Sequence, residues 1–417
     1  MTTPDDATPR PTPPPAWPAP GDGDAAPDPD SAWPPPGAPR PERVVAPWDW
    51  PSPEGGVSEG GDGDGPGNPA QDVPGWWIYR GAAEPHDGID RLPAAPPWRS
   101  FTDGTPPDGL LERPAPGAAD RRRAVRASRY QADREEIHLV NMALLLRRPL
   151  LVTGRPGLGK STLAYSIARE LQLGPVLRWS VTSRTTLQDG QYQYDAIGRL
   201  QDVGLHERAA AAHPSGEGGA HPELPDIGRY LRLGPLGTAL LPWRVPRVLL
   251  IDEIDKSDVD FPSDLLHVFE EGEFTVPELA RLHRPTAEVM TADDGGRVTL
   301  EHGRVSCHEF PLVILTSNEE REFPPAFLRR CIRLEIRRPD RRKLARLLAA
   351  HLPPADPAAA AVRDDLITTF LRKQDEEGAD LANDQLLNAV QLARQIWDTP
   401  EGYELIAEHA LRPLNEG

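Results

Sequence analysis

The sequence of 417 residues has little cysteine, only four lysines and no long apolar run. Cys307 and Cys331 are too few for a disulfide framework in a chain of this length, which favours a reducing, cytoplasmic compartment. Without 18 consecutive apolar residues, no transmembrane helix is expected. The amino terminus also lacks the basic and apolar regions of a secretory signal. We therefore expect neither a disulfide scaffold nor an integral membrane protein.

Proline and acidic residues are plentiful instead, and they gather near the amino terminus. The first 120 residues hold 29 of the 50 prolines, and 20 Asp or Glu against seven Arg. Such a segment cannot bury enough apolar surface to fold, so we expect residues 1–70 to form a disordered leader with polyproline character. The first 120 residues, with 20 acidic residues against seven Arg, carry −13 of the net charge of −18. The rest is near neutral and has no basic stripe, which argues against nucleic acid as a partner.

An aromatic segment follows the leader. Seven of the ten tryptophans precede residue 100, and Gly75–Phe101 contains the apolar run Trp76–Tyr79. Aromatic anchors in linear segments often mark binding, so this run is either a segment that docks on a folded domain or partner, or a sticky patch in a disordered tail. We assign residues 71–120 to a linker and leave both interpretations open.

The strongest chemical signal is Arg147–Thr162, RRPLLVTGRPGLGKST, in which an apolar strand runs into a glycine-rich loop and then a helix. This is the P-loop pattern G-x-x-x-x-G-K-[ST]. In it, inward-facing backbone N–H groups and the helix N-terminus bind phosphate, the lysine neutralises it, and the hydroxyl after the lysine ligates magnesium. The pattern predicts a nucleoside triphosphate with Mg²⁺, and ATP and GTP both remain open. The candidate nucleotide-binding residues are Gly154, Arg155, Pro156, Gly157, Leu158, Gly159, Lys160, Ser161 and Thr162, with Ser161 also a metal ligand.

A second acidic element follows about 90 residues later. Arg247–Lys256, RVLLIDEIDK, reads as a buried strand that ends in Asp252 and Glu253. In an open parallel sheet, ligands gather at the carboxyl ends of the strands. We expect Asp252 to hold magnesium and Glu253 to orient and deprotonate the attacking water.

Two further segments supply candidate catalytic residues. Phe310–Asn318, FPLVILTSN, is another buried strand, and Asn318 at its end either positions the water or γ-phosphate or simply ends the strand in a turn. The short helix of FPPAFLRRCIR ends in Arg329 and Arg330. Such an arginine, supplied to an adjacent subunit, neutralises charge on a transferring phosphate, and surface basicity is the alternative. We favour Arg330, with Arg329 second.

The order of these segments predicts the fold. Strands are expected at Leu150–Thr153, Val176–Val181, Val248–Ile251, Leu312–Thr316 and Ile332–Ile336. Helical connections between them indicate a mostly parallel sheet covered on both faces, an α/β P-loop core over residues 121–338 that opens with one helical stretch from Arg121 to Leu146. After Pro339 the pattern is wholly helical, so residues 339–417 are expected to form a small helical lid.

Together the segments GRPGLGKS, LLIDEIDKSD, ILTSN and FLRRC resemble the AAA+ ATPases, and among them the MoxR-like group, over about residues 126–417. The resemblance implies ATP and Mg²⁺ as cofactors and assigns Lys160, Asp252, Glu253, Asn318 and Arg330 the same roles as their chemistry does. It also implies a homo-oligomeric ring, a hexamer, that remodels or matures a protein client, with a von Willebrand factor A domain protein as a partner.

Two insertions fit the same group. Ser183–Trp243 contains SRTTLQDGQYQY, which resembles a loop and hairpin that faces the ring pore or a client, with Tyr192 and Tyr194 as contacts; a surface hairpin is the alternative. Leu282–Cys307 fits a second hairpin. One departure concerns the lid, where related proteins carry an arginine that contacts the γ-phosphate. Leu381–Leu392 has none, and whether Arg394 takes its place is left open.

Two other functions remain to be separated from this one. The first is a nucleic-acid motor or a GTP-using restriction subunit of related fold, which would show salt-sensitive DNA binding. The second is a nucleotide-gated scaffold with little hydrolysis, which the intact Glu253 opposes.

Overall fold

The computed structural model describes residues 74–82, 84–101, 109–212, 226–352, 357–376, 381–396 and 406–412. The leader expected at residues 1–70 lies outside these ranges. Across the described ranges, no helix combines the length and apolarity needed to cross a membrane.

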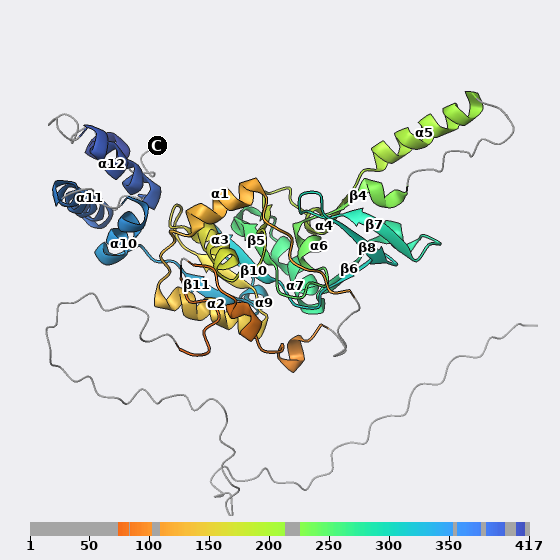
Figure 1. The fold of residues 1–417 in the computed structure, drawn as a ribbon, viewed down its shortest axis with the longest axis horizontal. Helices are drawn as coiled ribbons and strands as arrows, with labels where there is room; N and C mark the ends of the chain where they lie inside the picture. The colour runs from red at the N-terminus through yellow and green to blue at the C-terminus, as the bar shows by residue number, and fades with distance from the viewer. Residues whose placement is uncertain are drawn as a thin grey trace, which may run out of the picture. The chain divides into compact units, whose positions relative to one another are not determined.

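A five-stranded parallel sheet forms the centre of the fold (Figure 1). All five strands match the expected positions to within a residue at each end. Their spatial order is β11-β1-β10-β5-β2, which places the P-loop strand β1 between β11 and β10. The strands are β1 (Leu150–Thr153), β2 (Leu177–Ser180), β5 (Val248–Asp252), β10 (Leu312–Ser317) and β11 (Ile332–Glu335).

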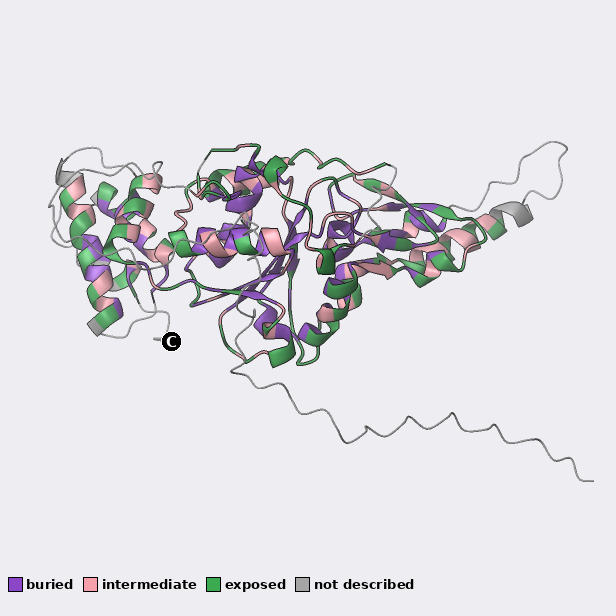
Figure 2. Cartoon of the chain, turned by 90° about the horizontal axis from the view of Figure 1, so that it is seen from below, coloured by how far each residue is buried: buried purple, intermediate pink, exposed green. Residues whose placement is uncertain are grey.

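Alternation along the strands builds a separate core on each face of the sheet. Leu150, Val152 and Leu250 point to one face and pack with α2 (Arg134–Leu146) and α3 (Lys160–Glu170). Their neighbours Leu151, Leu249 and Ile251 point to the other face and pack with α6 (Pro235–Ala239) and α7 (Phe261–Glu271). Figure 2 shows the buried residues concentrated along these layers. The predicted αβα arrangement, a sheet covered on both faces, is confirmed.

The helical stretch expected from Arg121 to Leu146 is two helices rather than one. α1 (Ala118–Ala127) ends at Ser128, and α2 begins after Asp133, whose backbone is extended. Between them, Tyr130 packs its ring against the P-loop at Gly159 and donates a hydrogen bond from its hydroxyl to Glu136 Oε2 at 2.8 Å. The break therefore brings an aromatic residue onto the phosphate-binding loop, which a continuous helix would have carried past it.

The aromatic segment before this point is buried in the α2–α3 side of the core. Trp77, Ile78 and Tyr79 are 5% exposed or less. Asn141 of α2 accepts hydrogen bonds from the N–H groups of Ile78 and Tyr79 and donates one to the Tyr79 carbonyl. Short 3₁₀ turns follow at η2 (Gly88–Arg91) and η3 (Pro97–Arg99).

The two predicted insertions meet in one second sheet. Its order is β3-β4-β7-β8, in which the first two strands come from one insertion and the last two from the other. The long helix α5 (Ala196–Ala212) and the turn η4 (Ile227–Tyr230) separate β3 from β4. The strands are β3 (Tyr192–Tyr194), β4 (Leu231–Leu233), β7 (Thr286–Met290) and β8 (Arg297–Glu301).

Tyr192 does not fit the role of an exposed contact. Tyr192 is 6% exposed and belongs to the core on the α6–α7 face of the sheet, and burial together with a hydrogen bond to Glu278 raises the pKa of its hydroxyl to about 12. Tyr194, two residues further along the same strand, is half-buried, and its hydroxyl accepts a hydrogen bond from Arg199 Nη1 at 3.0 Å. The prediction of a paired aromatic contact is therefore wrong for Tyr192.

A buried ion pair joins this second sheet to the central one. Arg247, just before β5, is fully buried and contacts both carboxylate oxygens of Asp293, which lies between β7 and β8, at 2.8 and 3.0 Å. Bidentate pairs of this kind have fixed geometry, so the insertion is held at a defined position at the base of β5. The remaining elements of the core are η5 (Ile254–Lys256), α4 (Leu187–Gln191), α8 (Pro277–Ala280), α9 (Pro325–Leu328), β6 (Glu273–Thr275) and β9 (Arg304–Ser306).

The carboxyl-terminal part is helical, as expected. α10 (Arg341–His351), α11 (Pro357–Glu376), α12 (Asn383–Ile396) and the π-helical turn η6 (Ile406–Ala410) enclose an apolar core of their own. At the boundary with the α/β part, Lys343 of α10 contacts two carboxylates of the α2 region, Asp133 and Glu136, each at 2.6 Å.

Candidate nucleotide-binding site

The loop between β1 and α3 has the backbone that phosphate binding requires. Gly154 has φ +136°, and a Cβ there would lie 2.5 Å from the Ile336 carbonyl oxygen, so only glycine fits. Gly157 has φ +76° at the exposed crown of the loop. The helix α3 begins at Lys160 directly after the loop, and its first N–H groups carry the positive end of the helix dipole.

Lys160 lies inside this loop with all its donors used. Its ammonium donates to the carbonyl oxygens of Gly154 at 2.6 Å and Arg155 at 2.9 Å, and to Asn318 Oδ1 at 2.7 Å. Burial lowers the pKa of Lys160, while Asp255, Asp252 and Glu253 pull that pKa upward. The loop thus holds a cation beside its own carbonyls, where a phosphate would offer charged acceptors in exchange.

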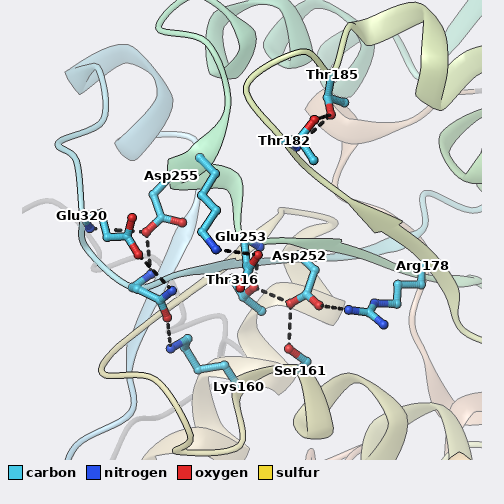
Figure 3. A network of polar contacts seen from close by, with 12 residues as sticks. Lys160, Ser161, Arg178, Thr182, Thr185, Asp252, Glu253, Asp255, Thr316 and Glu320 are labelled. Atoms are coloured by element: carbon cyan, nitrogen blue, oxygen red, sulfur yellow. Dashed lines mark hydrogen bonds and ion pairs between the residues drawn. The ribbon is translucent and has the colours of Figure 1, made fainter. Parts of the chain in front are cut away.

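Asp252 joins three elements at the carboxyl edge of the sheet (Figure 3). Its Oδ1 accepts from Ser161 Oγ at 2.7 Å and from Thr316 Oγ1 at 2.8 Å, and its Oδ2 lies 2.7 Å from Arg178 Nη2. Burial on its own raises the pKa of Asp252, but the hydrogen bonds from these three partners outweigh it and hold the pKa below its usual value. The carboxylate is therefore ionised at neutral pH.

Glu253 is held at the site in a strained backbone conformation. It has φ +63°, which is uncommon for a residue with a side chain and is found at functional sites. Its N–H donates to Thr316 Oγ1 at 2.9 Å, and its half-exposed carboxylate contacts Lys256 Nζ at 3.0 Å. The backbone is fixed, while the carboxylate faces a surface where water can reach it, as a general base requires.

Asn318 directly follows β10, and its amide oxygen accepts a hydrogen bond from Lys160, so the end of this strand contacts the P-loop. Asp255 holds this strand end in place, because its Oδ2 accepts from the N–H groups of Asn318 at 2.7 Å and Glu320 at 3.3 Å. The structure thus brings Asn318 into contact with the P-loop lysine, and its role in catalysis stays a prediction.

Arg329 and Arg330 lie at the amino ends of the strands, on the side of the sheet away from the P-loop. Their carbonyls accept from the guanidinium of Arg148, which precedes β1, so they sit at the amino ends of the strands. β1 has four residues, and at about 3.3 Å per residue it separates that edge from the P-loop by about 13 Å. Arg330 pairs with Glu270, and the Arg329 side chain is exposed. Neither arginine is placed to serve the site of its own chain.

The lid touches the P-loop at its crown. Asn383 N–H at the start of α12 donates to the Gly157 carbonyl at 3.3 Å, and a Cβ on Gly157 would lie 2.2 Å from Ala382 Cβ. Arg394 is 11 residues further along the same helix, about 16 Å away at 1.5 Å per residue. Arg394 is therefore poorly placed to reach a phosphate at this loop.

The residues at Asp252 fit a magnesium ion bound together with phosphates. Within the part of the chain that the structure describes, no group of three or more His, Cys, Asp or Glu could hold a metal. Mg²⁺ in phosphate-transfer sites needs fewer protein ligands, since it keeps waters and takes oxygens from the substrate. A Ser161 hydroxyl beside an ionised Asp252 carboxylate is a hard-oxygen pair of that type.

Three residues of this network escaped prediction as site residues. Thr316 and Asp255 both lie inside the motifs, at the end of β10 and three residues after Asp252, and their spacing could have revealed them. Arg178 lies in a strand with no motif, and only the pairing of β2 with β5 brings it to Asp252.

Comparison with known proteins agrees with the site. Residues 149–331 match the family model described as the AAA domain of the dynein-related subfamily. The match covers β1 through Cys331, and so includes every residue of the polar network around Asp252 and Lys160. A search of curated proteins finds no match.

Proposed function

We propose, from the premise that residues 149–331 form an AAA domain, that this chain is a MoxR-like AAA+ ATPase that hydrolyses ATP with Mg²⁺ in a ring of identical subunits. The observation that carries the proposal is the 2.7 Å contact between Ser161 Oγ and Asp252 Oδ1. It unites the P-loop helix with a strand end 91 positions away, as a shared metal would require.

The residues divide the work of hydrolysis between them. In the reaction, water attacks the γ-phosphorus and the bond to the β–γ bridging oxygen breaks, which leaves ADP and inorganic phosphate. Glu253 accepts the proton of that water, Asn318 helps to place it, and Lys160 and the loop amides bind the phosphate oxygens. Mg²⁺ held at Ser161 and Asp252 would neutralise charge on the β- and γ-phosphates.

The position of Arg329 and Arg330 supports the ring. They lie at the far edge of the sheet from their own P-loop, so an arginine finger from this helix would act on a neighbouring subunit. We favour Arg330 for this role, with Arg329 second, and a hexamer as the assembly. The output we propose is remodelling or maturation of a protein client, with a von Willebrand factor A domain protein as a candidate partner and no part for nucleic acid.

The test compares Glu253→Gln with Lys160→Ala. Glu253→Gln should lower ATP turnover by about 10²-fold or more, the usual loss on removing a general base, while ATP binding remains. Lys160→Ala should lose both. Glu271→Gln on the exposed end of α7 is the matched control and should leave turnover unchanged. Unchanged turnover in Glu253→Gln would instead indicate a scaffold, and saturable binding of GTP in place of ATP would overturn the nucleotide assignment.

The same variant addresses the client. An ATPase that remodels proteins should hold its client longest when ATP is bound and hydrolysis is blocked. Full-length Glu253→Gln with ATP should therefore retain a protein partner that Lys160→Ala does not retain. DNA binding that rises with ATP and falls steeply with salt would favour a nucleic-acid motor instead.

A further inference from the structure

Arg178 reaches Asp252 from an edge strand that belongs to no nucleotide-binding motif. β2 alternates between buried and exposed side chains, and Arg178 lies on the face of the sheet that α3 covers. Its register partner in β5 is Leu250, two residues before Asp252 on the same face of that strand. The long side chain spans the remaining distance, and its Nη2 lies 2.7 Å from Asp252 Oδ2 (Figure 3).

The two partners differ in how freely they can move. The Asp252 side chain is 9% exposed and is held by Ser161 and Thr316 on its other oxygen. The Arg178 side chain is 50% exposed. A flexible, half-solvated guanidinium can leave the carboxylate at little cost in desolvation, whereas the carboxylate cannot follow it.

Arg178 and a metal ion would require the same carboxylate. Two cations a few ångströms apart repel each other, and this repulsion is stronger near a partly buried site than in bulk water. A divalent ion shared by Ser161 and Asp252 therefore gains the carboxylate only as the guanidinium gives it up.

We propose that Arg178 is a competing cation, which occupies Asp252 while the site lacks metal and must be displaced when Mg²⁺ binds with nucleotide, and which thereby sets the metal affinity. The inference rests on the proposed nucleotide site. It adds a residue outside the motifs that governs how much Mg²⁺ the site needs. In the metal-free chain the same contact keeps a poorly solvated carboxylate paired, which avoids the cost of an uncompensated charge.

The experiment measures ADP affinity of the full chain by calorimetry, once with EDTA and once with saturating MgCl₂. ADP is used so that hydrolysis does not enter the readout. In Arg178→Gln, Mg²⁺ no longer displaces a cation, so ADP should bind about three- to tenfold more tightly with Mg²⁺ than it does to the wild type. Affinity in EDTA should change by less than about twofold, since the contact is to Asp252 and not to phosphate.

Two further variants guard against trivial explanations. Arg178→Lys keeps the charge and should stay near the wild-type Mg²⁺ dependence, which a purely structural role for the guanidinium would not predict. Arg333→Gln removes an exposed arginine from β11 at the other edge of the same sheet, and should leave both affinities as they are. Circular dichroism establishes that each variant is folded.

The outcomes are distinct. Equal or weaker ADP binding with Mg²⁺ in Arg178→Gln overturns the inference. A loss of affinity confined to EDTA also overturns it, because it makes Arg178 a phosphate contact. A wild-type chain that binds no ADP under either condition removes the proposed function and this inference together, whereas normal wild-type binding with an unresponsive Arg178→Gln removes the inference alone.

Discussion

Glu170 closes α3 with a carboxylate that has almost no contact with solvent. Its Oε1 accepts from Arg80 N–H at 2.6 Å and lies 3.0 Å from His86 Nε2, so it ties the aromatic segment to the P-loop helix. Burial raises the pKa of Glu170 to about 7, and the backbone N–H groups of the segment offset this only in part. Burial and the charges of Arg80 and Arg91 lower the pKa of His86, so both partners favour their neutral forms.

This carboxyl should make stability depend on pH. Because the pKa of Glu170 is about 7 in the folded chain and near 4.5 when unfolded, folding takes up a proton between those values. Its contribution is therefore fully present below about pH 4.5 and is lost as the pH rises through 7, by at most about 3 kcal/mol. Glu170→Gln is neutral throughout, so its Tm should exceed that of the wild type at pH 8 and approach it at pH 5.

His86 acts in the opposite direction, because its lowered pKa adds stability as the pH rises through the range below 6.5. The wild type and Glu170→Gln both retain His86, so the difference between their Tm values at each pH reports the carboxyl together with its contact to His86. A difference that is constant from pH 5 to pH 8 would contradict the assignment.

At this scale the sequence predicts residues whose roles are set by their own motif. Lys160, Ser161, Asp252 and Asn318 meet because a P-loop, a strand end and a neighbouring strand end must meet in a parallel sheet. Arg178 could not be predicted, since nothing in Leu177–Ser180 marks the one side chain that reaches across to β5. The contacts of Glu170 could not be predicted either, because they depend on where the aromatic segment with Arg80 and His86 packs.

Among the elements, α10 is attached to the core by the largely buried side chain of Lys343, with the exposed Arg346 as a second contact to Asp133. Lys343 is 12% exposed and contacts Asp133 and Glu136, and Glu136 also accepts from Tyr130, which packs on the P-loop. This chain of contacts runs from the first lid helix to Gly159 without an arginine from the lid. We call Lys343, Asp133, Glu136 and Tyr130 the hinge cluster.

Lys343→Met should loosen the lid. The change leaves the buried Glu136 without its cation, and breaking a buried pair by removal of one partner costs about 3 kcal/mol. We expect a lower Tm and faster proteolytic cleavage between β11 and α10, measured by limited proteolysis of the full chain. Arg346→Gln on the same helix removes an exposed partner of Asp133 and should cost less than about 1 kcal/mol. Equal effects of the two changes would show that the hinge cluster does not hold the lid.

The elements themselves were largely predictable, but not their long-range pairing. Buried β-rich runs located the five strands, because each is a short apolar segment between helical patterns. The break after Ser128 was missed because the apolar pattern continues across it, and the tertiary contact of Tyr130 with Gly159 decides it. The second sheet was missed because β4 pairs with β7 across more than 50 residues, and each insertion alone resembles an isolated hairpin.

For the molecule as a whole, the aromatic segment completes one face of the α/β core. Trp77, Ile78, Tyr79 and Ile89 are all buried there, and each such side chain contributes about 1.5–3 kcal/mol. A chain that begins at residue 74 keeps them, and one that begins at residue 93 exposes the surface of α2 and α3 that they cover.

Truncation should distinguish the contribution of residues 1–73 to stability from that of the aromatic segment. The chain from residue 74 should keep the Tm of the full chain within about 2 °C, whereas the chain from residue 93 should lose about 10 °C or more. Differential scanning calorimetry of the three proteins measures both values. Equal Tm values for the two truncated chains would mean that the aromatic segment adds nothing to the core.

The crown of the P-loop has two faces, and each has its own partner. Its inner side would offer backbone N–H groups to phosphate, and on its outer side the Gly157 carbonyl accepts a hydrogen bond from Asn383 of the lid. The same short stretch of main chain would therefore contact the ligand on one side and the lid on the other. Thermodynamic reciprocity then requires that, by whatever factor lid docking tightens the hold on nucleotide, nucleotide favours the docked lid equally. A main-chain contact of this kind couples the position of the lid to that of the loop without a charged side chain. The lid can therefore respond to an occupied site even though its Leu381–Leu392 stretch carries no arginine.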